Sequence, residues 1–379
     1  MKIALVIDDA LARPDGVQEY VRTIGSAMGE RGHEVHVLCS GDAGESPTGI
    51  ARVVSLTTNV GVTFNGNGLR SPRPASRRRL REHLAAERYD VIHVQTPHSP
   101  FFAARVVRQA RRVQGRGVRI VATFHILPDG AVSEWATRAL GLSLRRNLRL
   151  FDAFAAVSAP AAAFAKRAFG IDAAVIPNAV RVDDIAAQAA AKPWPVDPSG
   201  RTIVAFLGRL VERKGAVELV EAFALLPPKA RGKVALRIGG RGPLASRIEG
   251  LVAQHGLEAS VTLEGFIADD DKPGFMAAAD LAVFPATGGE SFGIVLTEAM
   301  AAGSGAVLGG DNPGYAWTLD NPDAVVKPRE TGAFAARLGA LLTDVGARAE
   351  LHAQQAERVK DFDVAVVAER VAALYGIPG

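Results

Sequence analysis

The sequence of 379 residues has few of the features that mark disulfide-rich or strongly aromatic proteins. Its one cysteine, Cys39, follows an apolar run and cannot form an internal disulfide, so we expect a buried thiol in a reducing compartment. Aromatic residues make up only 6%, whereas alanine and glycine are abundant. This composition fits tight packing of helices against sheets.

Long apolar runs and a strong net charge are also lacking. No stretch of about eighteen apolar residues occurs, so no membrane-spanning helix is predicted. The apolar run at 2–7 is too short for a signal peptide and meets Asp8 and Asp9. The 44 basic and 40 acidic residues give a formal charge of +4, which argues against a nucleic-acid binder but allows a local basic patch. We therefore expect a cytoplasmic protein without a nucleic-acid partner.

The chain is too long for one ordinary domain, and its patterns predict two α/β domains. An apolar strand at 2–7, a helix at about 17–31 and a strand at 34–39 open the chain. This order is typical of a doubly wound parallel sheet, which binds ligands beyond the carboxyl ends of its strands. Further strands are expected at 90–95, 119–124, 154–158, 202–207, 234–238, 261–267, 281–285 and 306–310, and residues 174–178 close the first domain with a Pro-Asn turn.

A proline-rich stretch separates the two domains. Residues 192–200 exclude a helix or a central strand because proline cannot donate a backbone hydrogen bond. We expect a first domain over 1–185, a linker over 186–200 and a second domain over 201–362. A last helix is predicted at about 363–375.

The most informative stretch is 287–303, which predicts the end of a strand, a glycine-bearing turn and a helix from about Gly293. Free N–H groups and the positive end of the helix dipole would face the turn and suit a diphosphate. Glu290 and Glu298 would repel a phosphate but accept hydrogen bonds from sugar hydroxyls. The turn therefore fits a nucleotide sugar, although two solvated glutamates beside a buried strand and helix are the plainer interpretation.

Glu290 and Glu298, with seven residues between them, resemble the E-x7-E motif of retaining glycosyltransferases of family 4, which have the GT-B fold. The wording Gly-Gly-Glu-Ser-Phe-Gly-Ile-Val-Leu is similar to that of the phosphatidylinositol mannosyltransferases of actinobacteria. The resemblance covers nearly the whole chain. It implies two Rossmann-like, doubly wound domains facing a cleft, with the C-terminal helix, about 363–379, crossing back to the first domain.

The resemblance also implies roles for residues beside the transferred sugar. Glu290 would orient the sugar and Glu298 the ribose, and Arg209 and Lys214 would clamp the leaving diphosphate. Without the resemblance, these two cations would be surface residues. His125 ends the strand at 119–124 and matches the histidine that faces the transferred sugar, although a histidine in such a place is more often structural.

Asp269 would accept hydrogen bonds from N1–H and the amino group of guanine, which uracil lacks, so GDP is favoured over UDP. The acidic run 269–271 also fits a solvated helix start. The residues assigned to the donor are Gly16, Ile267, Asp269, Lys272, Ser291, Phe292, Gly293, Ile294 and Glu298. Asp15 stands where family members usually carry a second glycine, and Gly16 also fits a simple helix cap.

Residues 64–70 predict a turn-rich loop in which Asn65, Asn67 and Arg70 offer groups for polyol hydroxyls and a phosphate. Without the resemblance this would be a surface turn. It resembles the loop that holds inositol phosphate in the mannosyltransferases, and these three residues are assigned to the acceptor. Ile126 replaces the threonine that usually follows the family's histidine.

A basic amphipathic helix is predicted directly after this loop, with Arg77, Arg78, Arg79 and Arg81. Such a patch suits an anionic membrane surface, at about 1 kcal/mol for each basic side chain near it. A solvated helix face is the alternative. The patch adds a peripheral position on the inner face of the plasma membrane to the expected cytoplasmic location.

No cluster of histidine, cysteine and aspartate has metal-ligand spacing, and no Asp-x-Asp ends a strand. We therefore expect no metal and no cofactor apart from the co-substrate, for which GDP-mannose is favoured. The expected reaction transfers a hexose to a hydroxyl of a lipid or small-molecule acceptor, with retention as the resemblance implies.

Three alternatives stay open at this point. The first is a family 4 glycosyltransferase that uses a UDP-sugar and a soluble acceptor. The second is a nucleotide-sugar epimerase or a phosphorylase on the same scaffold. The third is a silent binding module, because Asp15 and the stretch 309–314 depart from the family pattern.

Overall fold

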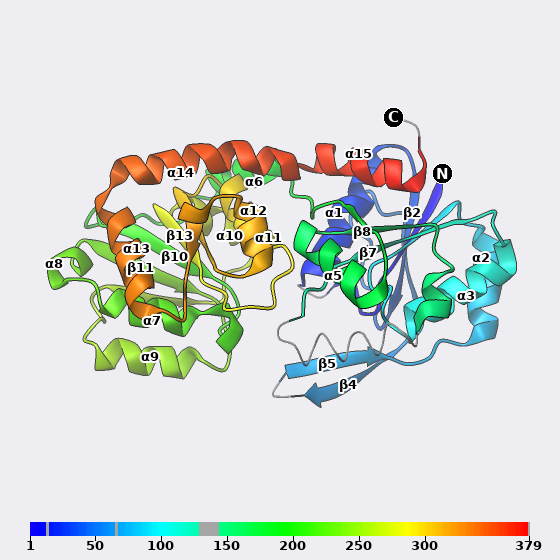
Figure 1. Ribbon diagram of the computed structural model, residues 1–379, viewed down its shortest axis with the longest axis horizontal. Coiled ribbons are helices and arrows are strands. Elements are labelled where there is room, and N and C mark those ends of the chain that lie inside the picture. The colour runs from blue at the N-terminus through cyan, green and yellow to red at the C-terminus, as the bar shows by residue number, and fades with distance from the viewer. Residues whose placement is uncertain (13–14, 65–66, 129–143, 378–379) are drawn as a thin grey trace. The chain divides into compact units, whose positions relative to one another are not determined.

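The computed structural model describes residues 1–12, 15–64, 67–128 and 144–377. The chain divides into two compact units, Met1–Ala179 with Val364–Gly379, and Val180–Asp363 (Figure 1). Each unit is an α/β domain built on one parallel sheet with helices packed against it. The predicted fold class, two doubly wound domains, is confirmed.

The first unit contains a seven-stranded parallel sheet. Its order is β3 (Arg52–Thr57), β2 (Glu34–Ser40), β1 (Lys2–Val6), β6 (Val91–Val94), β7 (Arg119–Phe124), β8 (Ala153–Ala156) and β9 (Ala174–Val175). Strand order reverses between β1 and β6, and doubly wound folds bind ligands at such a point. Its described helices are α1 (Gly16–Glu30), α2 (Arg77–Glu87), α3 (Phe102–Gln114), α5 (Ala159–Phe169) and α15 (Val364–Tyr375).

The spacing of apolar residues explains why α1 packs on this sheet. Tyr20, Ile24 and Met28 recur every four residues and are buried in the core of the first unit. The C-terminal helix α15 contributes Val371 and Tyr375 to the same core. The last helix therefore returns to the first unit, as predicted.

The single cysteine, Cys39, is buried in this core on β2, as predicted. Burial raises the pKa of its thiol to about 12, so the thiol stays protonated and unreactive at neutral pH.

The expected loop at 64–70 belongs to a hairpin that forms a separate two-stranded sheet. Strands β4 (Asn59–Phe64) and β5 (Asn67–Pro72) pair antiparallel, with Arg70 opposite Gly61 and Asn67 opposite Phe64. The expected loop is therefore mostly strand. Backbone pairing extends to Phe64 and Asn67, and residues 65–66 lie outside the described part of the chain.

The second unit contains a six-stranded parallel sheet. Its order is β12 (Val261–Gly265), β11 (Val234–Gly239), β10 (Thr202–Leu207), β13 (Leu281–Phe284), β14 (Ala306–Gly310) and β15 (Val325–Val326). Here the strand order reverses between β10 and β13. Its α-helices are α6 (Val182–Ala191), α7 (Ala216–Ala224), α8 (Pro228–Arg231), α9 (Ala245–Gln254), α10 (Lys272–Ala277), α11 (Ile294–Ala301), α12 (Pro313–Leu319), α13 (Thr331–Thr343) and α14 (Val345–Arg358). Short 3₁₀ turns are η1 (Glu212–Lys214), η2 (Asp269–Asp271), η3 (Pro322–Ala324) and η4 (Val359–Phe362).

The stretch expected to be a linker, 186–200, is packed onto the second unit. Its first residues lie in α6, which contacts α10 and α11. Asp197 is buried and its Oδ2 accepts from Nη2 of Arg201 at 2.7 Å. Its other carboxylate oxygen accepts from the backbone N–H of Ser199 at 2.9 Å. Proline excludes regular structure from 192–200, yet this buried aspartate still anchors the segment.

No helix in the described part of the chain combines the length and the apolar character needed to cross a bilayer.

Candidate functional site

The central feature of the second unit is a cluster of charges where its strand order reverses. Lys214 lies in η1, after β10, and Glu290 follows the neighbouring strand β13. Because the strands are parallel, their carboxyl ends meet at one edge of the sheet. Glu290 Oε1 accepts from Lys214 Nζ at 2.8 Å and from Arg213 Nη1 at 2.5 Å. Only 14% of the Glu290 side chain is exposed, so the three charges lie partly out of water.

Backbone contacts hold the two loops together. The N–H of Thr287 donates to the carbonyl of Arg213 at 3.0 Å. Gly215 has a φ of +76°, and a Cβ there would lie 1.9 Å from the carbonyl oxygen of Pro285. Only glycine fits this approach, and it places Lys214 beside Glu290.

The structure adds a cation to the predicted pair Arg209 and Lys214. Arg213 joins Lys214 at Glu290, and the role of Arg209 at the diphosphate stays a prediction. The side chain of Arg209 is exposed and forms no ion pair with a carboxylate of the described residues. The sequence contains one indication of this contact, the adjacent basic residues Arg213 and Lys214. A tight 3₁₀ turn can direct two such neighbouring side chains to one partner.

The helix α11 begins beside this cluster at Gly293. This glycine has a φ of +102°, and a Cβ on it would lie 2.4 Å from the ring of Tyr315. No side chain caps the start of the helix. The first N–H groups of α11 therefore have no side-chain cap competing for them, as an anion site at a helix terminus requires.

The other residues of the motif differ in burial, and therefore in whether a side chain or only the backbone can contact a nucleotide-sugar donor. Phe292 is 1% exposed, and its ring packs edge-on against Phe362 with centroids 5.2 Å apart. It therefore serves the core, and only its backbone is left for a donor contact. Ser291, Ile294 and Glu298 are half-buried. The position of Glu298 is inside α11, as predicted.

The residues assigned to the base lie after β12. Ile267 is buried, so its backbone is the part suited to hydrogen bonding. Asp269 Oδ1 lies 2.5 Å from Lys272 Nζ, and both side chains are partly exposed. The structure thus brings these two predicted residues together in an ion pair.

His125 lies in the first unit and is held by a neighbour that sequence reasoning missed. Its Nε2 is 3.0 Å from Oε1 of Gln95, which follows β6. An amide oxygen only accepts, so Nε2 carries the proton. Burial and nearby His98 lower the pKa of His125 to about 3, which leaves a neutral imidazole at physiological pH. The ring of Tyr20 packs edge-on at 4.9 Å.

At the start of α1 the structure has a helix cap. The N–H of Gly16 donates to Oδ1 of Asp15 at 2.7 Å. This N–H is therefore already paired, and a donor contact by Gly16 stays a prediction.

The predicted acceptor residues fall on the hairpin or outside the described residues. Asn67 and Arg70 lie on β5, and Asn65 lies outside the described part of the chain. The pairing of β4 with β5 fixes the backbone register of Asn67 and Arg70.

The basic patch forms the exposed face of α2. Leu80 and Leu84 are fully buried, which leaves the opposite side of the helix to solvent. Arg78 pairs with Glu82 at 3.2 Å, and Arg79 donates to the carbonyl of Ser55 at 3.0 Å. The exposed members of the patch are Arg77, Arg78, Arg79 and Arg81.

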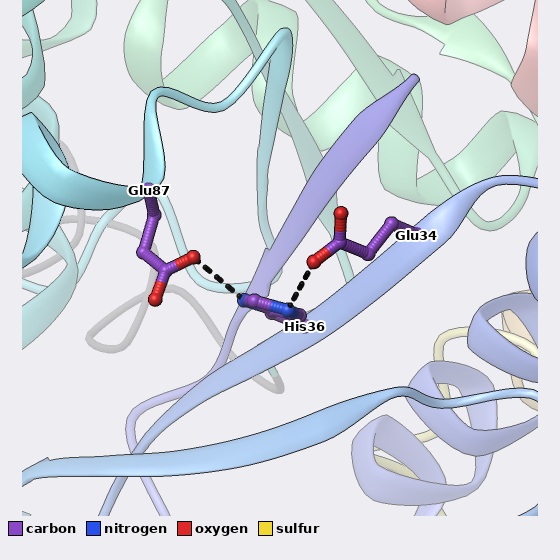
Figure 2. A group of neighbouring side chains, drawn as sticks. All are labelled: Glu34, His36 and Glu87. Carbon is purple, nitrogen blue, oxygen red and sulfur yellow. Dashed lines mark ion pairs between the residues drawn. The ribbon is translucent and has the colours of Figure 1, made fainter.

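Among the described residues, one group has the side chains of a metal site: Glu34, His36 and Glu87 (Figure 2). Figure 2 shows His36 between the carboxylates, with Nε2 3.0 Å from Glu34 and Nδ1 3.9 Å from Glu87. One ion cannot bind both nitrogens of one ring. Lys2 Nζ also lies 3.1 Å from Glu34 and 2.5 Å from Glu87 and supplies positive charge. We interpret this group as an ion-pair network at the amino-terminal ends of β1 and β2, and metal independence stays a prediction.

Comparisons with known proteins follow this division into two units. Residues 14–184 match the family described as Glycosyltransferase Family 4, and residues 190–361 match Glycosyl transferases group 1. The phosphatidyl-myo-inositol mannosyltransferase of Mycolicibacterium smegmatis is 32% identical over 99% of this chain and 93% of that protein. The protein of the same name from Mycobacterium leprae is 32% identical over 99% of this chain and 96% of its own.

Among solved structures, Anabaena HepE in complex with UDP has a TM-score of 0.74 at 19% identity and covers 99% of this chain and 100% of that chain. At this identity the likeness supports the fold alone. Together with the family matches and the mycobacterial relatives, it identifies this chain as a member of glycosyltransferase family 4 with the two-domain GT-B fold.

Proposed function

We propose that this glycosyltransferase moves mannose from GDP-mannose to a phosphatidylinositol-type acceptor, with retention at the anomeric carbon. Relatives named phosphatidyl-myo-inositol mannosyltransferase, 31–32% identical over nearly the whole chain, support the sugar and the acceptor. The observation that carries the donor site is the cluster of Lys214, Arg213 and Glu290 beside the start of α11.

The electrostatic task in this reaction is to stabilise negative charge on the departing diphosphate. Two cations share one carboxylate in the cluster, so it keeps a net positive charge. Lys214 and the first N–H groups of α11 would bind the diphosphate, and Arg209 would join them from its exposed position. Both cations bind Oε1 of Glu290, so we assign Oε2 to a hydroxyl of the sugar.

Retention follows from the family resemblance and from the chemistry of the groups present. Glu290, the carboxylate closest to the expected sugar, is held by two cations, which makes it a poor nucleophile. We therefore propose attack on the same face, with the leaving phosphate accepting the proton of the acceptor hydroxyl. His125, being neutral, would hydrogen-bond the sugar without acting as an acid.

The acceptor would be reached at a membrane surface. The four exposed arginines of α2 suit anionic lipid, at about 1 kcal/mol for each side chain. Asn67 and Arg70 on β5 are assigned to the polar head of the acceptor. This gives a peripheral protein on the inner face of the plasma membrane.

The test combines donor and acceptor in one assay. GDP-mannose and UDP-glucose are each offered with vesicles containing phosphatidylinositol, and with free inositol phosphate. Transfer from GDP-mannose to the lipid, with an α-linked product by NMR, supports the proposal. Transfer from the UDP-sugar alone, or to the soluble acceptor alone, would replace it with the corresponding alternative. Free isomerised sugar without an acceptor would indicate an epimerase.

A further inference from the structure

The C-terminal helix α15 brings a buried tyrosine to the first sheet. This helix contacts α1, β7 and β8, which all belong to the first unit. Tyr375, at its end, is buried, and its hydroxyl lies 2.8 Å from Nδ1 of His93, a fully buried residue of β6. Nε2 of the same ring lies 2.7 Å from Oγ1 of Thr123 on β7. One imidazole thus joins the last helix to the strand that precedes His125.

The direction of these two hydrogen bonds follows from the chemistry of the groups. Burial lowers the pKa of His93 to about 3, so its imidazole is neutral at physiological pH and has one donor and one acceptor nitrogen. A phenol is more acidic than an aliphatic alcohol and is therefore the better donor. The hydroxyl of Tyr375 thus donates to Nδ1, and the N–H at Nε2 donates to Thr123.

The same face of the sheet carries the groups that hold His125. Gln95 lies two positions after His93 and therefore shares its side of the sheet, and His125 is related to Thr123 in the same way. Nε2 of Gln95 donates to the carbonyl of His93 at 3.5 Å, and its Oε1 accepts from His125 at 3.0 Å. The ring of Tyr20 packs edge-on against both imidazoles, with centroids 6.1 Å from His93 and 4.9 Å from His125. In so closely packed an interior, a shift of His93 displaces the neighbours of His125.

We propose that Tyr375 and His93 are positioning residues, which hold the imidazole of His125 in place for the transfer step. The hydroxyl of Tyr375 fixes the ring of His93, and this ring in turn fixes Thr123. Strand β7 and Gln95 carry the constraint to His125. We call Tyr375, His93 and Thr123 the buried relay. The inference rests on the proposed function, because it needs His125 to hydrogen-bond the transferred sugar.

The test begins with Tyr375→Phe, which removes one hydroxyl and keeps the ring in the core. Displacing a group beside the substrate by about 1 Å can cost about a hundredfold in rate, and for this indirect contact we expect kcat to fall about tenfold while KM for the donor changes little. Thr123→Val, which lacks the hydroxyl, should act in the same direction. Thr123→Ser, which keeps it, should retain kcat. The substrates are GDP-mannose and vesicles containing phosphatidylinositol.

Tyr89→Phe is the matched control. Tyr89 is fully buried in the same unit, and its hydroxyl lies 3.0 Å from Nδ1 of His36 and 2.9 Å from Nε2 of His83. It precedes β6, whereas Gln95 follows this strand, so these contacts lie at the opposite end of the sheet from His125. Losing this buried tyrosine–histidine contact should lower the melting temperature, as in Tyr375→Phe, but leave kcat unchanged.

A spectroscopic readout needs no substrate. In the wild type, ¹⁵N NMR should show His93 protonated on Nε2 with Nδ1 as an acceptor. In Tyr375→Phe the ¹⁵N shifts of His125 should change, whereas in Tyr89→Phe they should stay as in the wild type.

The outcomes separate this inference from the proposed function. If His125→Ala lowers kcat but Tyr375→Phe does not, the buried relay is overturned while the proposed function stands. An equal fall of kcat in Tyr375→Phe and Tyr89→Phe would also overturn it, because both would then report stability alone. If His125→Ala retains kcat, the role of His125 and the relay fall together. If the wild type transfers no sugar, the proposed function falls, and unchanged ¹⁵N shifts of His125 in Tyr375→Phe would overturn the relay independently.

Discussion

The ammonium of Lys214 lies 2.8 Å from Oε1 of Glu290, although the two residues are 76 positions apart in the chain. Parallel pairing of β10 with β13 brings their loops together, and Gly215 allows the backbones to touch. A carboxylate that binds two cations leaves a positive cluster, which a diphosphate can use.

Replacing Lys214 tests whether this cluster supports the leaving group. Lys214→Met keeps the stem of the side chain and leaves Glu290 paired with Arg213, so the fold should persist. We expect kcat to fall about a hundredfold or more, the usual effect of losing one donor to a developing negative charge. Lys229→Met, on the exposed helix α8, is the control. An unchanged kcat in Lys214→Met, measured with GDP-mannose, would remove this lysine from the mechanism.

Gly293→Ala tests the start of α11. A Cβ there would meet the ring of Tyr315 at 2.4 Å, and the φ of +102° is strained for alanine. We expect a loss of about 1–3 kcal/mol of stability from the backbone alone, together with weaker GDP binding. Gly250→Ala, where nothing lies within 4 Å of a Cβ, should be neutral or slightly stabilising. Thermal unfolding and calorimetry measure the two effects, and equal behaviour of both variants would contradict the prediction.

Gln95→Ala tests how His125 is held. The imidazole loses the acceptor that fixes its proton on Nε2, so the ring can turn or change tautomer. Misplacing a group beside the substrate can cost about a hundredfold in rate, and we expect kcat to fall while KM for the donor changes little. Gln95→Glu should raise the pKa of His125 and add a pH dependence that the wild type lacks. Gln254→Ala, on the exposed end of α9, is the control. A wild-type ring protonated on Nδ1 by ¹⁵N NMR would refute the assignment.

Buried histidines make the free energy of unfolding depend on pH. Burial lowers the pKa of His93 to about 3, while its ring bonds to Tyr375 and Thr123 at 2.8 and 2.7 Å. Between this value and about 6.5 the unfolded chain binds the extra proton, so stability falls as pH drops, by up to about 1.4 kcal/mol per pH unit. Burial lowers the pKa of His98 to about 4, and His125 acts in the same direction.

Two carboxyl groups, Asp8 and Glu218, oppose this trend, because burial raises the pKa of each. Burial raises the pKa of Asp8 to about 6, so the folded state holds its proton and the contribution of Asp8 decreases as pH rises toward 6. The three histidines outweigh these two carboxyl groups, and we expect the melting temperature to fall between pH 6.5 and pH 4.5. His93→Gln should flatten this fall, and the exposed His255→Gln should not. A melting temperature that is unchanged over this range would contradict the assignment of these histidines as neutral.

If the arginines of α2 bind the membrane, their removal should weaken vesicle binding without changing GDP binding. Replacing Arg77, Arg78 and Arg81 by Gln removes three exposed charges, worth about 1 kcal/mol each at an anionic surface, or about a hundredfold in vesicle binding. Flotation with phosphatidylinositol vesicles measures it, and GDP binding should be unchanged. The matched control replaces the exposed Lys229, Lys233 and Arg329 of the second unit. Equal flotation of both triple variants would show that α2 is not the membrane surface.

Local patterns were enough for most of the fold. Apolar runs predicted β7, β10 and β14 with the ends that the structure has, since strands buried on both faces must be continuously apolar. The hairpin β4–β5 was not predicted, because its short polar strands carry glycine and asparagine and have the composition of a turn. The proline-rich composition of 186–200 predicts a linker, but this segment packs onto the second unit. Composition alone does not reveal that packing, because Asp197 is buried only when it pairs with Arg201.

The sequence by itself determined the order of strands and helices, the family and the residues of the E-x7-E motif. The order of elements follows from spacing along the chain, which dictates which residues face a core or end a strand. The family and the motif follow from the resemblance of residues 287–303 to known glycosyltransferases. Only the tertiary structure decided that Arg213 joins Lys214 at Glu290, that Phe292 belongs to the core, and that Gln95 holds His125. Such contacts join residues distant in sequence, and their partners depend on the crossing of strands and on distances of a few ångströms that no local pattern encodes.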